Sequence, residues 1–415
     1  MSAPADERPG GPADPAGFTE LAAEAHAFFA ARMPRRQRAV HRWGEGPDAV
    51  MGVATATGEE EAAEVARAQE WQRELFDAGL AWVDGPAEYG GGGLSAEHAA
   101  LVRRISAEYE VPNTGALMVS FQIVGPSILA HGTEDQKRTW LAPIWRGEVI
   151  CCQLFSEPEA GSDLASLRAA AARDGDEWVV NGQKVWSSGA HYSQLGELLV
   201  RTGTPADRHR GITAFLVEMD RPGVDVRPLR QITGTVHFNE VFLDEVRLPD
   251  GNRLGPLNEG WRVAQTALGG ERSLMSDEDN GILRDPIRKL FALARHVGLA
   301  DDEAVQELLA EAWARDQLLH VTGSRLSGTD APPGSVAKLQ MVANTEFYIA
   351  LATRLLGDQL IADTGEWGTF AWTEVLLGAP AHRIAGGSDE IQRNIIAERV
   401  LGLPREPRPT AKDPA

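Results

Sequence analysis

A block of short β-type segments separates two helical regions in this sequence, and that order limits the folds open to it. In the first region apolar residues recur at helical spacing, as in Phe18, Leu21 and Ala25. From Val149 to about residue 255 the chain instead has short runs rich in β-branched and aromatic residues, such as GITAFLVEM and VHFNEVFLDEVRLP. After Gly260 helical spacing returns. The order predicts an α+β multidomain protein with an all-β domain between two helical domains.

Changes of composition along the chain give the expected domain boundaries. We expect an N-terminal helical domain over residues 18–148, a middle β domain over 149–258 and a C-terminal helical domain over 259–403. The two ends, residues 1–17 and 404–415, are rich in proline and polar or charged residues, and we expect both to be disordered tails.

Two local features give sharper structural predictions. Residues 95–131 have the pattern of a helix throughout. The segment EWVVNGQKVWSS contains the dipeptide Asn181-Gly182, which favours a tight hairpin turn and so predicts two strands with a turn between them.

The charge and cysteine content argue against several classes of protein. The 415-residue chain carries a formal net charge of −20, which disfavours a broad basic surface for nucleic acid or an anionic membrane. Its two cysteines, Cys151 and Cys152, are adjacent and too few for a disulfide framework or a metal site built from cysteine alone. The sequence shows neither an apolar leader nor a run of about 18 apolar residues. We therefore expect a cytoplasmic protein with no metal centre, nucleic-acid partner or membrane insertion.

Two segments of the middle region carry side chains and turns that could hold a polar or aromatic ligand. In FSEPEAGSDLASL (155–167), Gly161 sets a turn, and the hydroxyls of Ser156 and Ser162, with exposed backbone N–H groups, could bond a flavin ring and a pyrophosphate. In NGQKVWSSGA (181–190), Trp186 could stack on an aromatic cofactor and Ser188 could donate a hydrogen bond to it. The alternatives are a solvated polar turn for the first segment and a core position for Trp186.

Two further segments of the C-terminal region carry candidate acids. GWRVAQTALGGERSLMS (260–276) reads as part of a largely buried helix over 260–283, in which Glu271 and Arg272 follow the apolar positions. The alternative interpretation of these two residues is a surface ion pair. Near the end of the chain, the pair Gly386–Gly387 precedes Ser388, Asp389 and Glu390. Acids at the start of a helix are favoured by capping and by the helix dipole, so we expect Ser388 or Asp389 to be the N-cap of the last helix.

Taken together, these four segments resemble the flavin-dependent acyl-CoA dehydrogenase superfamily, from about residue 70 to 405. The resemblance implies an N-terminal helical domain, a middle β-barrel and a C-terminal four-helix bundle. It also implies FAD bound between the β-barrel and the C-terminal helices. The residues that correspond to cofactor contacts are Leu154, Phe155, Ser156, Gly161, Ser162, Trp186, Ser188, Ser388 and Glu390, with Gly161 and Ser162 toward the pyrophosphate or the CoA.

The resemblance also suggests where the catalytic base lies. Many relatives carry a glutamate at the position of Gly386, whereas a smaller subgroup carries the base on the first helix of the C-terminal domain, directly before an arginine, as in Glu271–Arg272. Glu271 is then expected to remove the α-proton while the β-hydrogen leaves as hydride to flavin N5, giving a trans-2-enoyl thioester. A carboxylate base needs a raised pKa, and the thioester oxygen needs hydrogen-bond donors. The backbone N–H at Gly386 would be such a donor, with Ser162, Arg272 and Gly387 on the substrate side.

The implied partners are an acyl thioester of CoA or of a carrier protein, an external acceptor such as an electron-transfer flavoprotein, and further copies of the chain in a homodimer or homotetramer. Residues 284–298 and 355–368 lack two motifs that reach a neighbouring subunit's FAD in many relatives, and Gly269 replaces a common aspartate. Two alternatives therefore stay open. The chain could be a flavin oxidase or monooxygenase on the same fold, or a non-catalytic acyl-CoA-binding subunit of a hetero-oligomer.

Overall fold

The computed structural model describes residues 15–36, 43–45, 48–50, 57–274, 283, 285–326 and 333–405. At positions 15–16, 271–274, 324, 326 and 333 it describes the backbone alone. Of the two predicted tails, 1–17 is described only from Pro15, where the first helix begins, and 404–415 only as far as Arg405.

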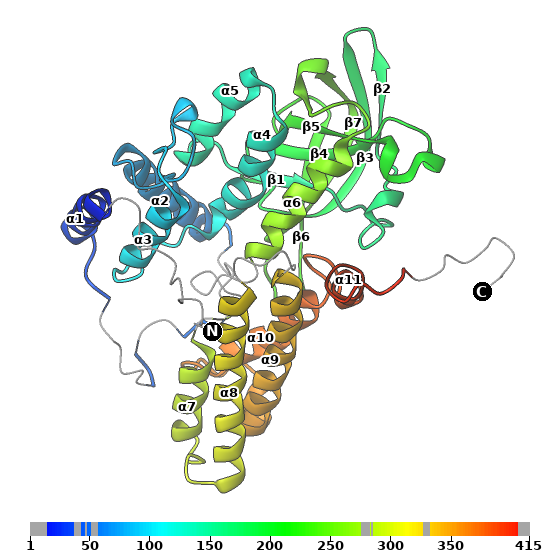
Figure 1. Cartoon of the computed structure of the whole chain (residues 1–415). Coiled ribbons are helices and arrows are strands. Elements are labelled where there is room, and N and C mark those ends of the chain that lie inside the picture. Colours follow the sequence, from blue (N-terminus) through cyan, green and yellow to red (C-terminus); the bar gives the residue numbers. More distant parts are fainter. Residues whose placement is uncertain are drawn as a thin grey trace, which may run out of the picture.

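The N-terminal region is helical, as predicted (Figure 1). Its core is aromatic: the rings of Phe29 and Tyr109 stack with centroids 5.5 Å apart, and Trp71 packs beside Phe29. A capping box starts the last helix, because Thr133 and Gln136 satisfy each other's backbone N–H groups. The helices are α1 (Pro15–Arg32), α2 (Glu59–Asp77), α3 (Ala96–Ser106), α4 (Gly125–His131) and α5 (Glu134–Trp145), with the short 3-10 turns η1 (Ala87–Tyr89) and η2 (Gly115–Leu117).

The prediction of one helix over 95–131 is wrong. After α3 the chain leaves the helix, and Tyr109 enters the N-terminal core. Pro112 follows, and because proline lacks an N–H it cannot continue a helix from the preceding turn. Helical structure resumes with η2, and the π-helical turn η3 (Ser120–Val124) then leads directly into α4. Single π turns often lie at functional sites.

The middle region forms one sheet in the strand order β6-β7-β3-β2-β4-β5-β8, with β1 paired to β4 in parallel (Figure 1). The predicted succession of helical, β and helical regions is therefore confirmed. The strands are β1 (Cys151–Leu154), β2 (Ala170–Asp174), β3 (Glu177–Ser188), β4 (Leu195–Arg201), β5 (Ile212–Glu218), β6 (Val224–Leu229), β7 (Phe238–Pro249) and β8 (Arg253–Leu254).

The predicted hairpin turn at Asn181-Gly182 is also wrong, because β3 runs through both residues. β7 pairs with β3 along most of its length, with a register shift at Asn181, whose side-chain oxygen accepts a hydrogen bond from the N–H of Glu245. The turn lies earlier, at Gly175, whose φ of 63° suits the reversal between β2 and β3. Pairing with β7 keeps Asn181 in the strand, opposite a bulge of two residues in β7 that includes Glu245, whose φ is 50°.

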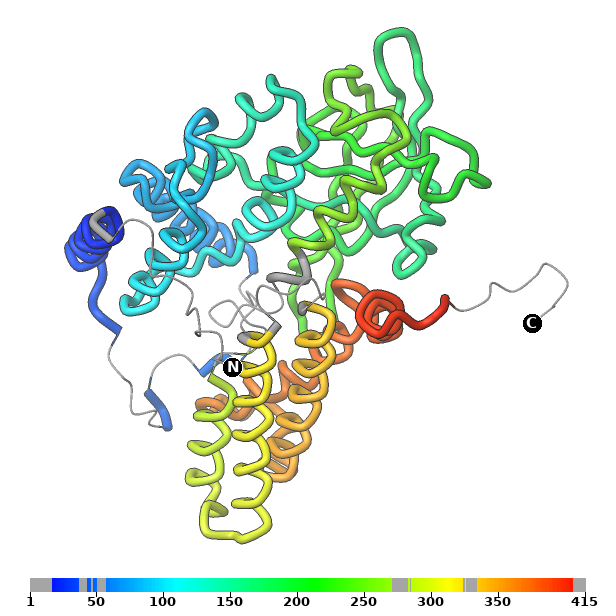
Figure 2. Tube along the Cα trace, in the orientation of Figure 1, coloured from blue at the N-terminus to red at the C-terminus, as the bar shows by residue number. Residues whose placement is uncertain are grey.

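The C-terminal region begins with α6 (Gly260–Leu274), which packs against β5, α4 and η3 rather than inside the bundle. Figures 1 and 2 show the bundle helices extending away from the other two regions. The bundle consists of α7 (Pro286–His296), α8 (Glu303–Leu326), α9 (Pro333–Leu356) and α10 (Phe370–His382), and the 3-10 turn η7 (Gly357–Leu360) lies between the last two. The short α11 (Asp389–Ile395) and the π turn η8 (Ile396–Val400) follow. Within the described residues, none of the helices is both long and apolar enough to cross a membrane.

One segment crosses from the N-terminal part of the chain to the bundle. Val50 is buried in the bundle core with Leu290 and Trp372, although it lies in the range predicted for the N-terminal domain. Lys289 on α7 donates a hydrogen bond to the carbonyl oxygen of Ala49. The bundle is thus completed by residues from before α2.

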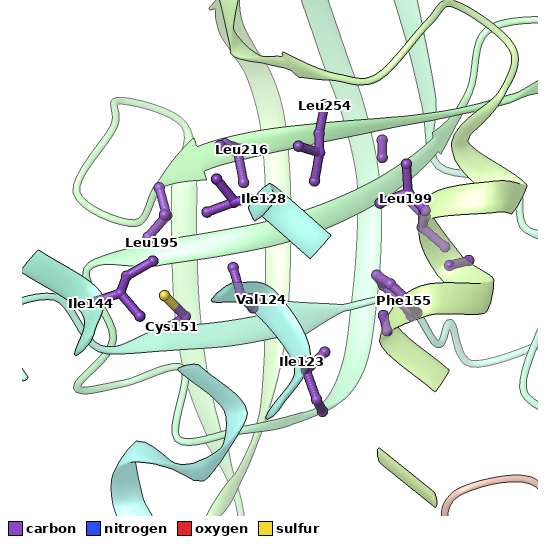
Figure 3. Close-up of a cluster of buried hydrophobic side chains, with 14 of the residues drawn as sticks. Ile123, Val124, Ile128, Ile144, Cys151, Phe155, Leu195, Leu199, Leu216 and Leu254 are labelled. Carbon is purple, nitrogen blue, oxygen red and sulfur yellow. The ribbon is translucent and has the colours of Figure 1, made fainter. Parts of the chain in front are cut away.

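A single apolar cluster joins the sheet to the helices on one of its faces. Strand residues such as Leu195 and Leu254 surround Ile128 of α4, as Figure 3 shows, and Val263 and Ala267 of α6 belong to the same cluster. Burying a side chain of this size contributes about 1.5–3 kcal/mol. The cluster therefore fixes α4, η3 and α6 over the same face of the sheet.

Glu197 on β4 is an acid inside this apolar interface. Its side chain is fully buried, and neither carboxylate oxygen has a well-oriented hydrogen-bond partner among the described residues. Burial raises the pKa of Glu197 to about 8, against a smaller opposing effect of the Ser127 hydroxyl. The folded protein therefore holds this carboxyl as the neutral acid at neutral pH.

We expect Glu197→Gln to remove a pH dependence of stability. The folded-state pKa of Glu197, about 8, lies above the value of 4.5 for a free side chain, so the wild type loses stability as the pH rises through this window. The loss has a limit of about 1.4 kcal/mol per pH unit. Denaturant unfolding at pH 5, 6.5 and 8 measures the unfolding free energy of both proteins. As the pH rises, the substituted protein should gain stability relative to the wild type. An equal difference at all three pH values would contradict the assignment.

Candidate active site

The edge of the sheet where β1 and β3 end brings together four of the predicted flavin contacts. The N–H of Val185 donates to the carbonyl oxygen of Ser156 at 2.9 Å, which places Phe155 and Ser156 beside Trp186 and Ser188. Trp186 is 57% exposed, so its interpretation as a core residue is wrong. Its φ is +61° at a bulge in β3. Such strain in a non-glycine residue is typical of functional positions.

Two neighbours on β1 differ in what they offer this edge. The side chain of Leu154 is fully buried in the core cluster with Leu198 and Phe215, so at the edge it contributes backbone atoms. Gln153 has a buried amide nitrogen with no hydrogen-bond partner among the described residues. An unsatisfied buried donor is costly unless a ligand or water meets it. Gln153 is not among the site residues predicted from the sequence, although a glutamine within the apolar run CCQLF is itself a signal.

Glu157 and Lys184 form a buried ion pair beneath the loop that follows β1. Lys184 is fully buried, and its Nζ lies 2.8 Å from Glu157 Oε1 and 3.1 Å from the carbonyl oxygen of Phe155. The Glu157 carboxylate also accepts from the backbone N–H groups of Arg168 and Ala169, at 2.6 and 2.9 Å. Burial lowers the pKa of Lys184 to about 8, and Glu157 counters that shift. Both ends of the loop are therefore tied to one carboxylate.

Arg201 closes the same loop from the other side. Its guanidinium donates to the carbonyl oxygens of Leu167 and Ala165, at 3.0 and 2.7 Å, and also to those of Thr204 and Arg208. The loop tip, with Gly161 and Ser162, stays exposed. The loop is held at its base while the predicted pyrophosphate or CoA contacts face solvent. Sequence reasoning missed Glu157, Lys184 and Arg201.

A glycine fixes the end of α6 against the π turn η3. A Cβ atom at Gly270 would lie only 1.7 Å from the carbonyl oxygen of Gln122, so any side chain there requires the helix to move. Glu271 and Arg272 follow in the same last turn of α6. Their side chains lie outside the described part of the structure, so their predicted roles remain predictions. The backbone position of Glu271 is set by this helix-to-turn contact.

The glycine pair near the C-terminus turns its carbonyl groups inward. Gly386 and Gly387 have φ values of 65° and 88°. Gln392 donates to both of their carbonyl oxygens, at 2.8 and 3.0 Å, and the buried Lys338 donates to that of Gly387. Neither glycine N–H donates a hydrogen bond within the described residues. Among the residues that the structure describes, these two backbone donors are left without an acceptor.

The acids after the glycine pair have structural partners. Ser388 is the N-cap of α11, because its hydroxyl accepts from the N–H of Ile391 at 3.4 Å, which confirms the predicted cap. Asp389 is buried and paired with Arg383 at 3.0 Å. The carboxylate of Glu390 is three-quarters exposed and lies 3.9 Å from Arg393. These contacts favour a structural role for Asp389, whereas the exposed contact of Glu390 contributes little.

Helix α9 packs against both α6 and α11, and its Lys338 donates to the carbonyl oxygen of Gly387, so the glycine pair lies beside a helix that also contacts α6. Comparison with known proteins shows which protein family has this arrangement. Three family models match in order: the acyl-CoA dehydrogenase N-terminal domain over residues 48–148, the middle domain over 152–246 and the C-terminal domain over 258–401. The acyl-CoA dehydrogenase IpdE1 of Mycobacterium tuberculosis is 40% identical over 366 residues, which cover 86% of this chain and 93% of that protein.

The chain belongs to the acyl-CoA dehydrogenase family. It is accordingly an oxidoreductase that acts on acyl-CoA, and the predicted family fold is confirmed. The acyl-CoA dehydrogenase FadE34 of M. tuberculosis is 39% identical over 352 residues, or 83% of this chain and 48% of that protein.

Solved structures of the family agree with this assignment. The Tcur3481-Tcur3483 steroid ACAD matches with a TM-score of 0.69 and 29% identity over 94% of this chain and 99% of that one. The ChsE4-ChsE5 complex of M. tuberculosis matches with a TM-score of 0.69 and 28% identity over 94% of this chain and 98% of that one.

We expect Lys184→Met to destabilise the protein by about 3–5 kcal/mol, because it leaves the Glu157 carboxylate buried without its cation. The double variant Lys184→Met with Glu157→Gln should recover part of this loss, since no net charge then stays buried. Chemical denaturation of the three proteins measures both effects. A double variant no more stable than the single one would show that the pair is not the source of the loss.

We expect Gly270→Ala to cost about 1–3 kcal/mol, because its methyl group overlaps the Gln122 carbonyl. The matched control is Gly323→Ala in α8, where a Cβ meets nothing within 4 Å. That change should be neutral or stabilise the helix by up to about 1 kcal/mol. Urea unfolding of both variants tests the contact, and equal effects would refute it.

Proposed function

We propose that this chain is an FAD-dependent dehydrogenase that converts an acyl thioester into the trans-2-enoyl thioester, with Glu271 as the base. The observation that carries the proposal is the Gly386–Gly387 segment. It lacks the carboxylate that many relatives place there, yet it keeps two backbone N–H donors with no acceptor among the described residues. The family membership supplies the reaction class, and Glu271 at the end of α6 supplies an acid.

The residues at the sheet edge suit a flavin. The Trp186 ring is exposed and offers a stacking face, Ser188 offers a hydroxyl, and the unsatisfied amide of Gln153 offers a buried donor. Phe155 supplies an apolar wall against α6. FAD, when bound, would take up the β-hydrogen of the substrate with its electron pair. Ser162 at the exposed loop tip would meet the pyrophosphate or the CoA.

The chain's own groups would do the remaining chemistry. The thioester carbonyl oxygen would accept hydrogen bonds from the N–H groups of Gly386 and Gly387, which makes the α-proton more acidic. Glu271 would take this proton, and exclusion of water would raise its affinity for it. Arg272 would lie on the substrate side of the same helical turn.

The acyl group we propose is a bulky one derived from a steroid or related ring system. Support comes from the solved relatives named steroid ACAD, which are 28–29% identical to this chain. An electron-transfer flavoprotein is the proposed acceptor of the electrons. A panel of linear, branched and steroid-side-chain CoA thioesters, scored by loss of flavin absorbance, tests the substrate class. Preference for short linear chains would overturn it.

A second candidate is a subunit of a hetero-oligomer that needs a different acyl-CoA dehydrogenase chain to complete its site. The ChsE4-ChsE5 relative is a complex of two named proteins, and residues 284–298 and 355–368 depart from the usual inter-subunit motifs. Purification of this chain alone tests it. A yellow, active homo-oligomer supports the complete enzyme, whereas a colourless protein supports the subunit. Oxygen uptake without another acceptor would indicate an oxidase instead.

Glu271→Gln should abolish substrate-dependent flavin bleaching, by a factor of about 10³ or more, while leaving FAD bound. The amide has the size of the acid but cannot accept the α-proton. Glu259→Gln, just before α6, is the control and should bleach normally. Single-turnover absorbance at the flavin band gives the rate. A Glu271→Gln variant that bleaches at the wild-type rate would rule out this base.

A further inference from the structure

A chain of three polar side chains runs from the N-terminal domain to the end of β3. The Nε2 atom of His191 lies 3.0 Å from Oε2 of Glu61, in the first turn of α2. The Nδ1 atom of the same ring lies 3.0 Å from the side-chain nitrogen of Asn239 on β7. Asn239 is fully buried, and the side chain of Glu61 is one-tenth exposed. Glu61 and Asn239 are therefore more buried than the members of a typical surface ion pair.

The contacts assign the proton on His191. The amide nitrogen of Asn239 also lies 3.0 Å from the carbonyl oxygen of Ser187 and 3.3 Å from that of His237, so its two hydrogens are shared among three neighbours. An amide nitrogen can donate a hydrogen bond but cannot accept one. The Nδ1 atom of His191 must then accept, and the ring proton sits on Nε2, where it is donated to Glu61. Asn239 therefore donates to His191, and His191 donates to the Glu61 carboxylate.

The hydrogen-bonded chain of side chains ends at the carbonyl oxygen of Ser187, next to the strained Trp186. Ser187, whose carbonyl oxygen Asn239 holds, lies between Trp186 and Ser188. Backbone strain of the kind seen at Trp186, with its φ of +61°, costs about 1–3 kcal/mol and persists only where the surroundings fix it. The N–H of Gly189 adds a second tie, at 3.0 Å to the carbonyl oxygen of His237.

We propose that Glu61, His191 and Asn239 form a positioning chain that holds Trp186 and Ser188 in the orientation required at the flavin face. The inference rests on the proposed function, because it assumes that the flavin ring lies against these two residues. The packing of α2, which carries Glu61, would thus set the backbone geometry at Trp186 and Ser188. None of the three side chains touches the reacting atoms, so each acts through the backbone of β3 and β7.

The test uses the full-length protein with its FAD and compares two substitutions at one position. Glu61→Leu removes the acceptor for His191, whereas Glu61→Gln keeps an oxygen in the same place. Glu60→Leu, at the exposed neighbouring position of α2, is the control for added apolar surface. The measurements are kcat and KM, the visible circular dichroism of the flavin, and hydrogen exchange of residues 183–190.

We expect Glu61→Leu to lower kcat about tenfold with KM within about twofold, to change the flavin circular dichroism and to speed exchange in 183–190. Glu61→Gln and Glu60→Leu should resemble the wild type. A Glu61→Leu variant with a lower unfolding midpoint but unchanged kcat, dichroism and exchange overturns the inference and leaves the proposed function intact. A wild-type protein that takes up no FAD overturns the proposed function, and the inference with it.

Discussion

The apolar contact between one face of the sheet and the helices above it is the interaction on which the rest of this structure depends. It holds η3 and α4 from the N-terminal domain and α6 from the C-terminal domain on the same strands. Apolar burial is strong but has no direction, at about 25 cal/mol per Å². A steric contact adds specificity, because only a glycine at position 270 lets α6 approach the carbonyl oxygen of Gln122 so closely. Together they determine where the helix that carries Glu271 ends.

Buried charge, rather than regular secondary structure, holds the loop after β1. The Glu157 carboxylate accepts three hydrogen bonds, one from Lys184 and two from backbone N–H groups. The Arg201 guanidinium donates to backbone carbonyl oxygens of this loop and of the loop that follows β4. Charges withdrawn from water are costly unless their hydrogen-bonding capacity is filled, and here it largely is. This leaves Gly161 and Ser162 at a free tip on a fixed base, an arrangement suited to a polar ligand.

The sequence predicted the parts of the fold that depend on local pattern. Helical spacing on both sides of a β-rich block gave the correct order of regions, and the polar start of the last helix gave its cap at Ser388. The errors came where partners distant in sequence decide. Asn181-Gly182 favours a turn in isolation, but pairing with β7 keeps it in a strand, and the break before Thr114 depends on Tyr109 entering a core.

The candidate site divides in the same way. Motif residues such as Phe155, Ser156, Trp186 and Ser188 were found from the sequence, and the structure brings them to one edge. The residues that support them were not found, because Lys184 and Arg201 look like ordinary surface cations until their burial is known. His191 likewise has no signal without Glu61, which lies 130 positions earlier in the chain.

The burial of Val50 in the C-terminal bundle has a consequence for how the chain is made. The hydrogen bond from Lys289 to Ala49 joins residues 240 positions apart, so the segment before α2 has no place to pack until most of the chain has left the ribosome. Regions fold in order of synthesis where their contacts are local, and long-range contacts delay this. The segment around Val50 must therefore pack together with the bundle, whereas the sheet, whose strands lie between residues 151 and 254, can pair earlier. Any shortened version of this protein that starts after residue 50 would carry an open gap in the bundle core.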